Sequence, residues 1–210
     1  MLALFRHDGE YFIQVDGVEL MSTRRVHSER AIAELACAPF RDVAGARVLV
    51  GGLGFGFTLE AALALLRPDA QVVVAEIVAE VIAWNLNPEY DLAREALGDA
   101  RVELRHADVA DVLRASGADD ARFDAIILDV DNGADALTNA GNARLYRDDG
   151  IRMAVAALRP GGRLAYWSAN DDPAFATALR RAGLSVEIRR VRAHATTGPR
   201  HVIFLADRAR

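Results

Sequence analysis

The sequence predicts an α/β fold: a doubly wound, mostly parallel, seven-stranded sheet of Rossmann type with a small β appendage at the N-terminus. Three observations carry this prediction. Apolar runs of strand length alternate with segments of helical spacing. A glycine-rich turn follows the first buried run, and acids stand directly after three of the strands. At 210 residues and 52% hydrophobic composition, the chain can form one domain with a sizeable core.

The N-terminal residues have a pattern of their own. Two Asp-Gly pairs, which favour tight hairpin turns, separate three short apolar runs at residues 2–6, 11–15 and 18–21. We therefore expect a β-hairpin appendage over residues 1–27 and a cofactor-binding domain over residues 28–210. Ser28 is expected to cap a helix that Pro39 ends.

The remaining chain alternates strands and helices. Strands are predicted at residues 46–51, 71–76, 101–105, 123–129, 163–168, 184–191 and 200–206. Asp148 and Asp149 suit the first turn of a helix that Pro160-Gly161-Gly162 would stop, and Asp172-Pro173 is expected to open another. The last two strands have no helix between them, so an antiparallel hairpin is expected at the sheet edge.

The most informative motif is the glycine turn after the first of these seven strands. It reads Gly52-Leu53-Gly54-Phe55-Gly56, and Glu76 ends the next strand twenty residues later. Such a turn lets a ligand approach the bare backbone, and the acid stands where it can hold a ribose diol. This βαβ unit predicts an adenosine-containing cofactor. A nicotinamide dinucleotide is disfavoured, because the dinucleotide motif would need glycine where Phe57 stands.

Two further acids follow strands whose carboxyl ends should converge on one rim of the sheet. Asp108 follows the third strand and either caps the next helix or contributes to a site. Asp129 ends the fourth strand, after four apolar residues. An acid that emerges from a buried strand into a cleft is more often functional than structural.

Composition excludes several chemistries. The sequence contains no lysine, which removes Schiff-base and Walker A mechanisms, and the five histidines lack metal-ligand spacing, so no metal is expected. The net charge of −5 argues against a nucleic-acid partner. No apolar stretch has membrane-spanning length and no leader is evident at the start, so we expect a cytoplasmic protein. A homodimer through the appendage or the edge hairpin is plausible.

These residues resemble the spermidine synthase (polyamine aminopropyltransferase) family, on the class I fold of S-adenosylmethionine-dependent methyltransferases. Glu76 matches that family's ribose-binding acid, Asp108 its adenine-contacting acid and Asp129 its catalytic aspartate. The resemblance implies S-adenosylmethionine, or its decarboxylated form, as the cofactor. Its binding residues would be Gly52, Gly54, Phe55, Gly56, Glu76 and Asp108, and the acceptor pocket would contain Asp131, Asn132 and Tyr146.

The sequence also departs from the family. Phe55 replaces the aspartate that holds the amino group of the decarboxylated cofactor, and Asn132 replaces the second aspartate of the catalytic motif. The family's Tyr-His-Glu reads His27-Ser28-Glu29, with only Glu29 retained. The nucleoside half of the family's site is thus present, whereas the polyamine half is altered.

We therefore predict a transferase that moves an alkyl group, with methyl slightly favoured, to a small-molecule acceptor that can be an amine. Asp129 would be the base that removes the acceptor's proton. Two alternatives stay open: a true polyamine aminopropyltransferase, and a non-catalytic module that binds a nucleoside thioether.

Overall fold

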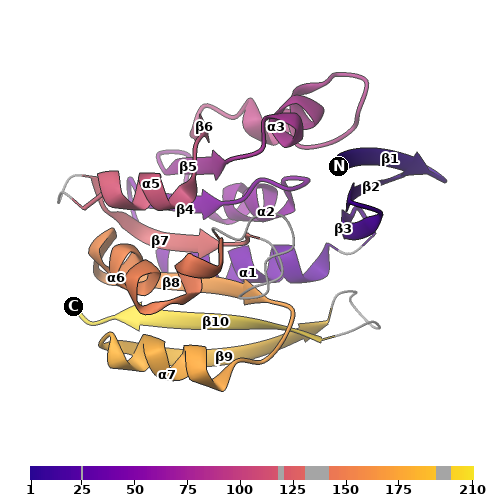
Figure 1. The fold of residues 1–210 in the computed structure, drawn as a ribbon. Helices are drawn as coiled ribbons and strands as arrows, with labels where there is room; N and C mark the ends of the chain where they lie inside the picture. The colour runs from indigo at the N-terminus through magenta and orange to yellow at the C-terminus, as the bar shows by residue number, and fades with distance from the viewer. Residues whose placement is uncertain (25, 118–120, 131–141, 193–199) are drawn as a thin grey trace.

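The computed structural model describes residues 1–24, 26–117, 121–130, 142–192 and 200–210. The main sheet has seven strands in the order β6-β5-β4-β7-β8-β10-β9 (Figure 1). Its neighbouring strands are parallel except where β10 pairs with β8 and with β9. The strands are β4 Arg47–Gly51, β5 Gln71–Glu76, β6 Val102–His106, β7 Phe123–Leu128, β8 Leu158–Ser168, β9 Leu184–Arg192 and β10 Arg200–Arg208. The predicted fold class is confirmed, including the antiparallel edge.

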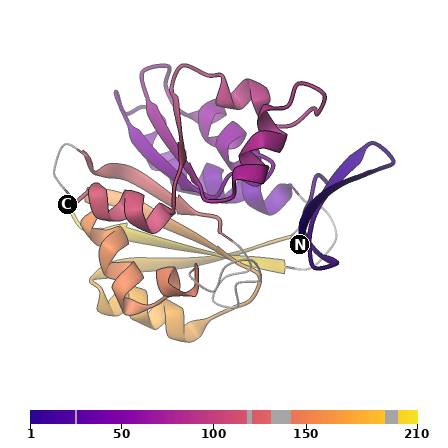
Figure 2. The ribbon, with the colours of Figure 1, turned by 45° about the horizontal axis from the view of Figure 1, so that its top comes forward.

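Helices cover both faces of this sheet, as Figure 2 shows for α6 and α7 against the helices of the N-terminal half. Successive strand residues point to opposite faces. Val48 and Val50 therefore join one core with α1 and α2, while Leu49 joins the other core with α5 to α7. The helices are α1 His27–Cys37, α2 Phe57–Leu65, α3 Ala79–Leu86, α4 Arg94–Leu97, α5 Val109–Ala115, α6 Asp148–Ala156 and α7 Pro173–Arg181. Within the described ranges, no helix is long and apolar enough to cross a membrane.

The N-terminal residues form a separate antiparallel sheet of β1 Leu2–His7, β2 Glu10–Val15 and β3 Val18–Ser22. Both predicted Asp-Gly turns have positive φ at each residue, as type I′ hairpin turns require. Figure 1 shows this sheet beyond the ends to which the parallel strands point. Tyr11 and Ile13 are buried in the core shared with α1 and α2, so the appendage packs directly on the larger sheet's helices.

Two local predictions were wrong. Ser28 does not cap α1: the helix begins at His27, and the buried Ser28 hydroxyl lies 3.0 Å from Nδ1 of His201 on β10. Pro160-Gly161-Gly162 does not stop the preceding helix, which ends at Ala156; these residues belong to β8. The register of β8 against β7 shifts just there, and this irregularity accommodates the proline and glycines.

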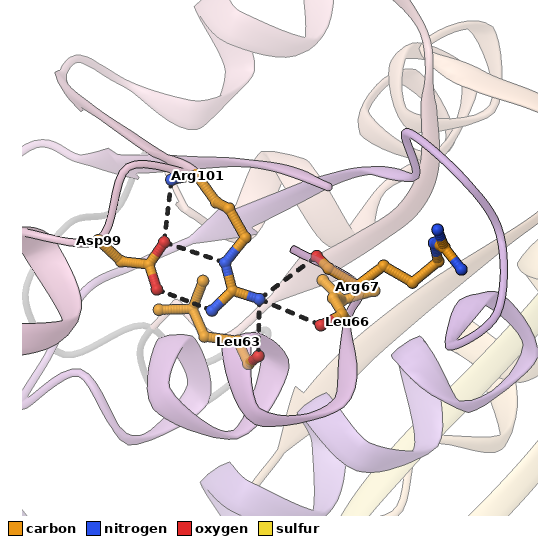
Figure 3. A network of polar contacts seen from close by, with 5 residues as sticks. All are labelled: Leu63, Leu66, Arg67, Asp99 and Arg101. Carbon is orange, nitrogen blue, oxygen red and sulfur yellow. Dashed lines mark hydrogen bonds and ion pairs between the residues drawn. The ribbon is translucent and has the colours of Figure 1, made fainter. Parts of the chain in front are cut away.

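Arg101, the residue before β6, fixes the end of α2 (Figure 3). Its Nη1 donates to the carbonyl oxygens of Leu63, Leu66 and Arg67 at 2.9, 3.1 and 3.4 Å. These acceptors include carbonyls that a helix C-terminus leaves without partners. Asp99 holds the guanidinium through two oxygens, and the hydrogen bonds from Arg101 lower the pKa of Asp99 to about 2. The network keeps the βαβ unit closed at the end remote from the glycine turn.

Candidate active site

The glycine turn, which follows β4, lies close to the backbone of β5 and of Asp129 after β7. The Gly52 N–H donates to the Ala75 carbonyl at 2.9 Å, which ties the turn to β5. Gly52 has a φ of 91°, and a Cβ there would lie 2.3 Å from the carbonyl oxygen of Asp129. Gly56 has a φ of 83°, and a Cβ there would lie 2.2 Å from Cβ of Ala93. Both positions therefore require glycine for conformation and for space.

Glu76 holds this turn in place. One carboxylate oxygen accepts from the Leu53 N–H at 2.9 Å, and the other accepts from the Val78 N–H at 2.8 Å. The side chain is buried, with 7% of its surface exposed. Each carboxylate oxygen has a second lone pair, so both can still accept from a ligand hydroxyl. The acid predicted to bind ribose is thus also the clamp between β5 and the glycine turn.

Asn85 is a buried residue that supports the glycine turn and that sequence reasoning missed. Its Nδ2 donates to the Gly54 carbonyl at 2.7 Å and to the Val81 carbonyl at 2.8 Å, while its Oδ1 accepts from the Ala93 N–H at 3.2 Å. The buried amide thereby joins α3, the turn and the segment before α4. Nothing in the local sequence pattern around Asn85 distinguishes it from a surface residue.

A cavity lies over the carboxyl ends of the parallel strands, and we call it the glycine-turn cavity. Glu76, Asp108 and Asp129 all line it, which brings together the three acids predicted from the strand ends. The small N-terminal sheet closes one side with apolar side chains. The other lining residues are Leu2, Ile13, Leu20, Met21, Gly52, Gly54, Ala75, Ile77, Val78, Val81, Ala107, Val109 and Val130.

Asp108 combines the two roles that the sequence left open. Its Oδ1 caps α5 by accepting from the Ala110 N–H at 2.8 Å. Its Oδ2 pairs with the guanidinium of Arg144, in the 3-10 segment Asn142–Tyr146. The cap fixes the carboxylate at the rim of the glycine-turn cavity. An adenine amino group at this rim would share Asp108 with Arg144, a contact that the sequence did not predict.

Asp129 follows β7, and hydrogen bonds hold both its backbone and its side chain. Its backbone N–H donates to the Gly51 carbonyl at 3.0 Å, and its Oδ2 accepts from the Thr58 hydroxyl at 2.7 Å. Thr58 is the second residue of α2, so the helix that starts at the glycine turn also orients the carboxylate. The second carboxylate oxygen, Oδ1, takes no part in this hydrogen bond.

A second cavity adjoins the first, and we call it the Glu29 cavity. Asp129, Leu20 and Met21 line both cavities and therefore lie where the two meet. Its remaining lining residues are Glu19, Ser22, Ser28, Glu29, Trp167, Ala169 and His201. It is built from the N-terminal sheet, the start of α1, the end of β8 and the start of β10, segments far apart in the chain.

The carboxyl groups of Glu29 and Asp129 both have raised pKa values. Burial, and then the nearby charge of Asp129, raises the pKa of Glu29 to about 8. Burial raises the pKa of Asp129 to about 6, and the hydrogen bond from Thr58 opposes that shift. Near neutral pH, the pair thus shares about one proton, which Glu29 holds more readily than Asp129. A carboxylate with a pKa near 6 is a better proton acceptor than an ordinary aspartate.

Two other predicted site residues lie elsewhere. Phe55 is buried and faces the hollow that contains Phe57 and Tyr90, so its side chain does not line the glycine-turn cavity. Tyr146 packs against Tyr166 and Phe175, and its hydroxyl donates to the Trp167 carbonyl at 2.9 Å. This is a core position, and the geometry gives no support to a role in the acceptor pocket. Asp131 and Asn132 lie outside the described residues.

Comparison with known proteins places these features in context. A polyamine aminopropyltransferase from Corynebacterium efficiens is 33% identical to this chain over 150 residues, which cover 71% of the chain. Over this stretch the chain is similar in sequence to a polyamine aminopropyltransferase. It spans only 27% of the length of that curated relative. No family model matches the chain.

Solved structures agree on the fold. Spermidine synthase from Thermotoga maritima superposes with a TM-score of 0.69 at 16% identity, over 95% of this chain and 66% of that one. A putative O-methyltransferase from Klebsiella pneumoniae gives a TM-score of 0.58 at 18% identity, over 88% of this chain and 89% of that one. At these identities, the likeness shows a fold shared by both kinds of protein.

Gly52→Ala tests the closeness of the turn to Asp129. A left-handed φ costs a residue with a Cβ about 1–2 kcal/mol, and overpacking adds about 1–3 kcal/mol. We expect an unfolding free energy lower by about 2–5 kcal/mol in chemical denaturation. Gly9→Ala is the matched control, since Gly9 has a φ of 83° with no atom within 4 Å of its Cβ position. Equal losses in the two variants would contradict the close approach.

The raised pKa values predict how stability depends on pH. The folded chain holds these protons more tightly than the unfolded chain, so their contribution is complete below about pH 4 and is lost as the pH rises through about 6 and 8. We expect the Tm of the ligand-free protein to fall over this window. Glu29→Gln, which cannot ionise, should flatten the upper part of the profile, and the exposed Glu80→Gln should not. A Glu29→Gln profile parallel to wild type would refute the assignment.

Proposed function

We propose that this chain transfers an alkyl group from S-adenosylmethionine, or its decarboxylated form, to a small-molecule amine, with Asp129 as the base. The observation that carries the proposal is that Asp129 lines both cavities. The donor would occupy the glycine-turn cavity and the acceptor the Glu29 cavity. Asp129 would then stand beside the atoms that react.

The residues of the glycine-turn cavity suit a nucleoside donor. Glu76 offers two carboxylate oxygens for two hydroxyls, and Asp108 offers an acceptor at the rim. Gly52 and Gly54 leave the backbone uncovered on the cavity side. These are the groups that a ribose, an adenine amine and a ligand lying against the turn would need.

When bound, the sulfonium donor would supply an electrophilic carbon and a thioether leaving group that takes the electron pair of the broken carbon–sulfur bond. Asp129 would accept the proton that the acceptor nitrogen loses, so charge and atoms balance. Thr58 keeps one oxygen of Asp129 in place and leaves the other for this proton. Leu20 and Met21 line the junction with apolar side chains. Positioning of two reactants in this way can supply about 7–11 kcal/mol of the barrier reduction.

Methyl transfer is favoured over aminopropyl transfer. A propylammonium group needs an acid near the turn, and Phe55 supplies none. The N–H groups of Gly52, Leu53 and Gly56 already donate within the protein, so the turn amides left for a carboxylate, such as that of intact S-adenosylmethionine, are those of Gly54 and Phe55. The name of the curated relative supports the other candidate, a polyamine aminopropyltransferase.

A titration with the two donors separates these candidates. We expect S-adenosylmethionine to bind more tightly than its decarboxylated analogue, by about tenfold or more, because one charge-assisted hydrogen bond contributes about 1.5–3 kcal/mol. Calorimetry would measure both affinities, with methylthioadenosine as the reference that carries neither chain end. Tighter binding of the decarboxylated form would make aminopropyl transfer the leading function.

A further inference from the structure

Two residues that line the Glu29 cavity each carry a buried polar atom with no hydrogen-bond partner among the described residues. The atoms are Oε2 of Glu29 and Nε1 of Trp167, and both are shielded from bulk solvent. Native structures pair nearly all such atoms, with the protein, with water or with a ligand. Both residues line the same cavity, so a small molecule bound there would lie beside both side chains.

The two atoms require different chemical groups on a ligand. The indole Nε1–H of Trp167 is only a donor, so its partner must carry a hydrogen-bond acceptor. The carboxyl of Glu29 lies near Asp129, and their pKa values of about 8 and about 6 leave the pair with about one negative charge near pH 7. A single cationic amine would neutralise that charge.

The other residues that line the Glu29 cavity limit the charge of a ligand that can bind there. Among the described residues, the cavity is lined by three carboxylic acids and by no arginine. His201, the one basic side chain, already contacts the Ser28 hydroxyl through Nδ1 and meets the Trp167 ring edge-on at a centroid distance of 4.7 Å. An anionic group would therefore be repelled. The acceptor atom for Trp167 must belong to a neutral group.

We propose that the Glu29 cavity binds a monoamine that carries a neutral oxygen acceptor, such as the hydroxyl of an amino alcohol. The amine would lie between Glu29 and Asp129, and the oxygen would accept from Nε1 of Trp167. The inference rests on the proposed function, because it names the class of acceptor for that reaction. A diamine is disfavoured: Glu19 could take its second ammonium, but the indole N–H would still lack an acceptor.

The test is a competition between matched amines. The protein is first titrated with S-adenosylhomocysteine alone, which examines the donor cavity independently. The loaded protein is then titrated by calorimetry with 3-amino-1-propanol, 1,3-diaminopropane and butylamine. We expect 3-amino-1-propanol to bind about 2- to 12-fold more tightly than butylamine, the range of one net hydrogen bond, and more tightly than the diamine.

Trp167→Phe removes the indole N–H and keeps an aromatic ring. We expect this variant to lose the preference for the amino alcohol over butylamine, while binding S-adenosylhomocysteine as wild type does. Trp84→Phe is the control, since Trp84 lies on α3 and does not line the cavity. Tighter binding of the diamine, no binding of any amine, or a preference that survives in Trp167→Phe would overturn the inference. Failure of S-adenosylhomocysteine to bind would instead overturn the proposed function.

Discussion

Asp129→Asn should lower the transfer rate by about 10²- to 10⁴-fold, the usual contribution of one positioned base. The asparagine keeps the shape of the side chain and an oxygen that can still accept from the Thr58 hydroxyl, but it cannot take a proton from an amine. The Tm should be unchanged or slightly higher, because a buried carboxyl with a raised pKa is replaced by a neutral group. Turnover is measured with an amine panel, and cofactor affinity by titration with S-adenosylhomocysteine.

A second aspartate on the same strand serves as the control. Asp124 accepts from the backbone N–H of Arg47 and from the guanidinium of Arg159, both at 2.7 Å, and lies at the opposite end of β7 from the two cavities. Asp124→Asn should therefore lower the Tm and leave turnover per folded molecule unchanged. If Asp129→Asn retains full turnover, Asp129 is not the base and the chain has no identified one.

The sequence predicted the seven-stranded sheet because parallel strands buried on both faces are continuous apolar runs. Most of the predicted strand limits lie within one or two residues of those in the structure. The start of β8 was missed by five residues, since Pro160-Gly161-Gly162 is an ordinary stop signal and only pairing with β7 makes it a strand. Pairing of this kind depends on residues distant in the chain, which local propensity cannot report.

The same difference between local sequence patterns and contacts of distant residues applies to the site. Glu76, Asp108 and Asp129 could be placed together in advance, because the topology of a doubly wound sheet brings strand ends to one rim. The contribution of Met21 and the nearness of Glu29 to Asp129 could not. They depend on how a second sheet packs beside the first, and a hundred residues separate the two acids.

Phe55 illustrates a further limit. Its place in the turn was predictable, but the direction of its side chain was not. The φ values of Gly54 and Gly56, 52° and 83°, set the path of the turn and carry the Phe55 ring away from the glycine-turn cavity toward Phe57. The sequence alone shows that phenylalanine stands in place of an aspartate. The structure adds that this side chain points away from the glycine-turn cavity.

Glu76→Ala should abolish the thermal stabilisation by S-adenosylhomocysteine or methylthioadenosine. In the wild type, a ligand at 100 times its Kd adds about 2.7 kcal/mol to the free energy of unfolding, and NAD should add little. The substitution removes the acceptor for both ribose hydroxyls. It also leaves the N–H groups of Leu53 and Val78 without their partner, each at a cost of about 1–3 kcal/mol, so the ligand-free Tm should fall as well.

Because Glu76 acts on both the ligand and the turn, a second variant must separate the two effects. Asn85→Ala loosens the same turn through the Gly54 carbonyl but does not line the glycine-turn cavity. It should lower the Tm and keep most of the ligand-induced shift. The affinities of methylthioadenosine and its 2′,3′-dideoxy analogue, measured for the wild type and both variants, then complete a thermodynamic cycle. Loss of the hydroxyls should weaken binding to the wild type and to Asn85→Ala, and should change nothing in Glu76→Ala. If the analogue binds the wild type as tightly as the parent nucleoside, Glu76 holds only the turn, and the ribose-binding assignment fails.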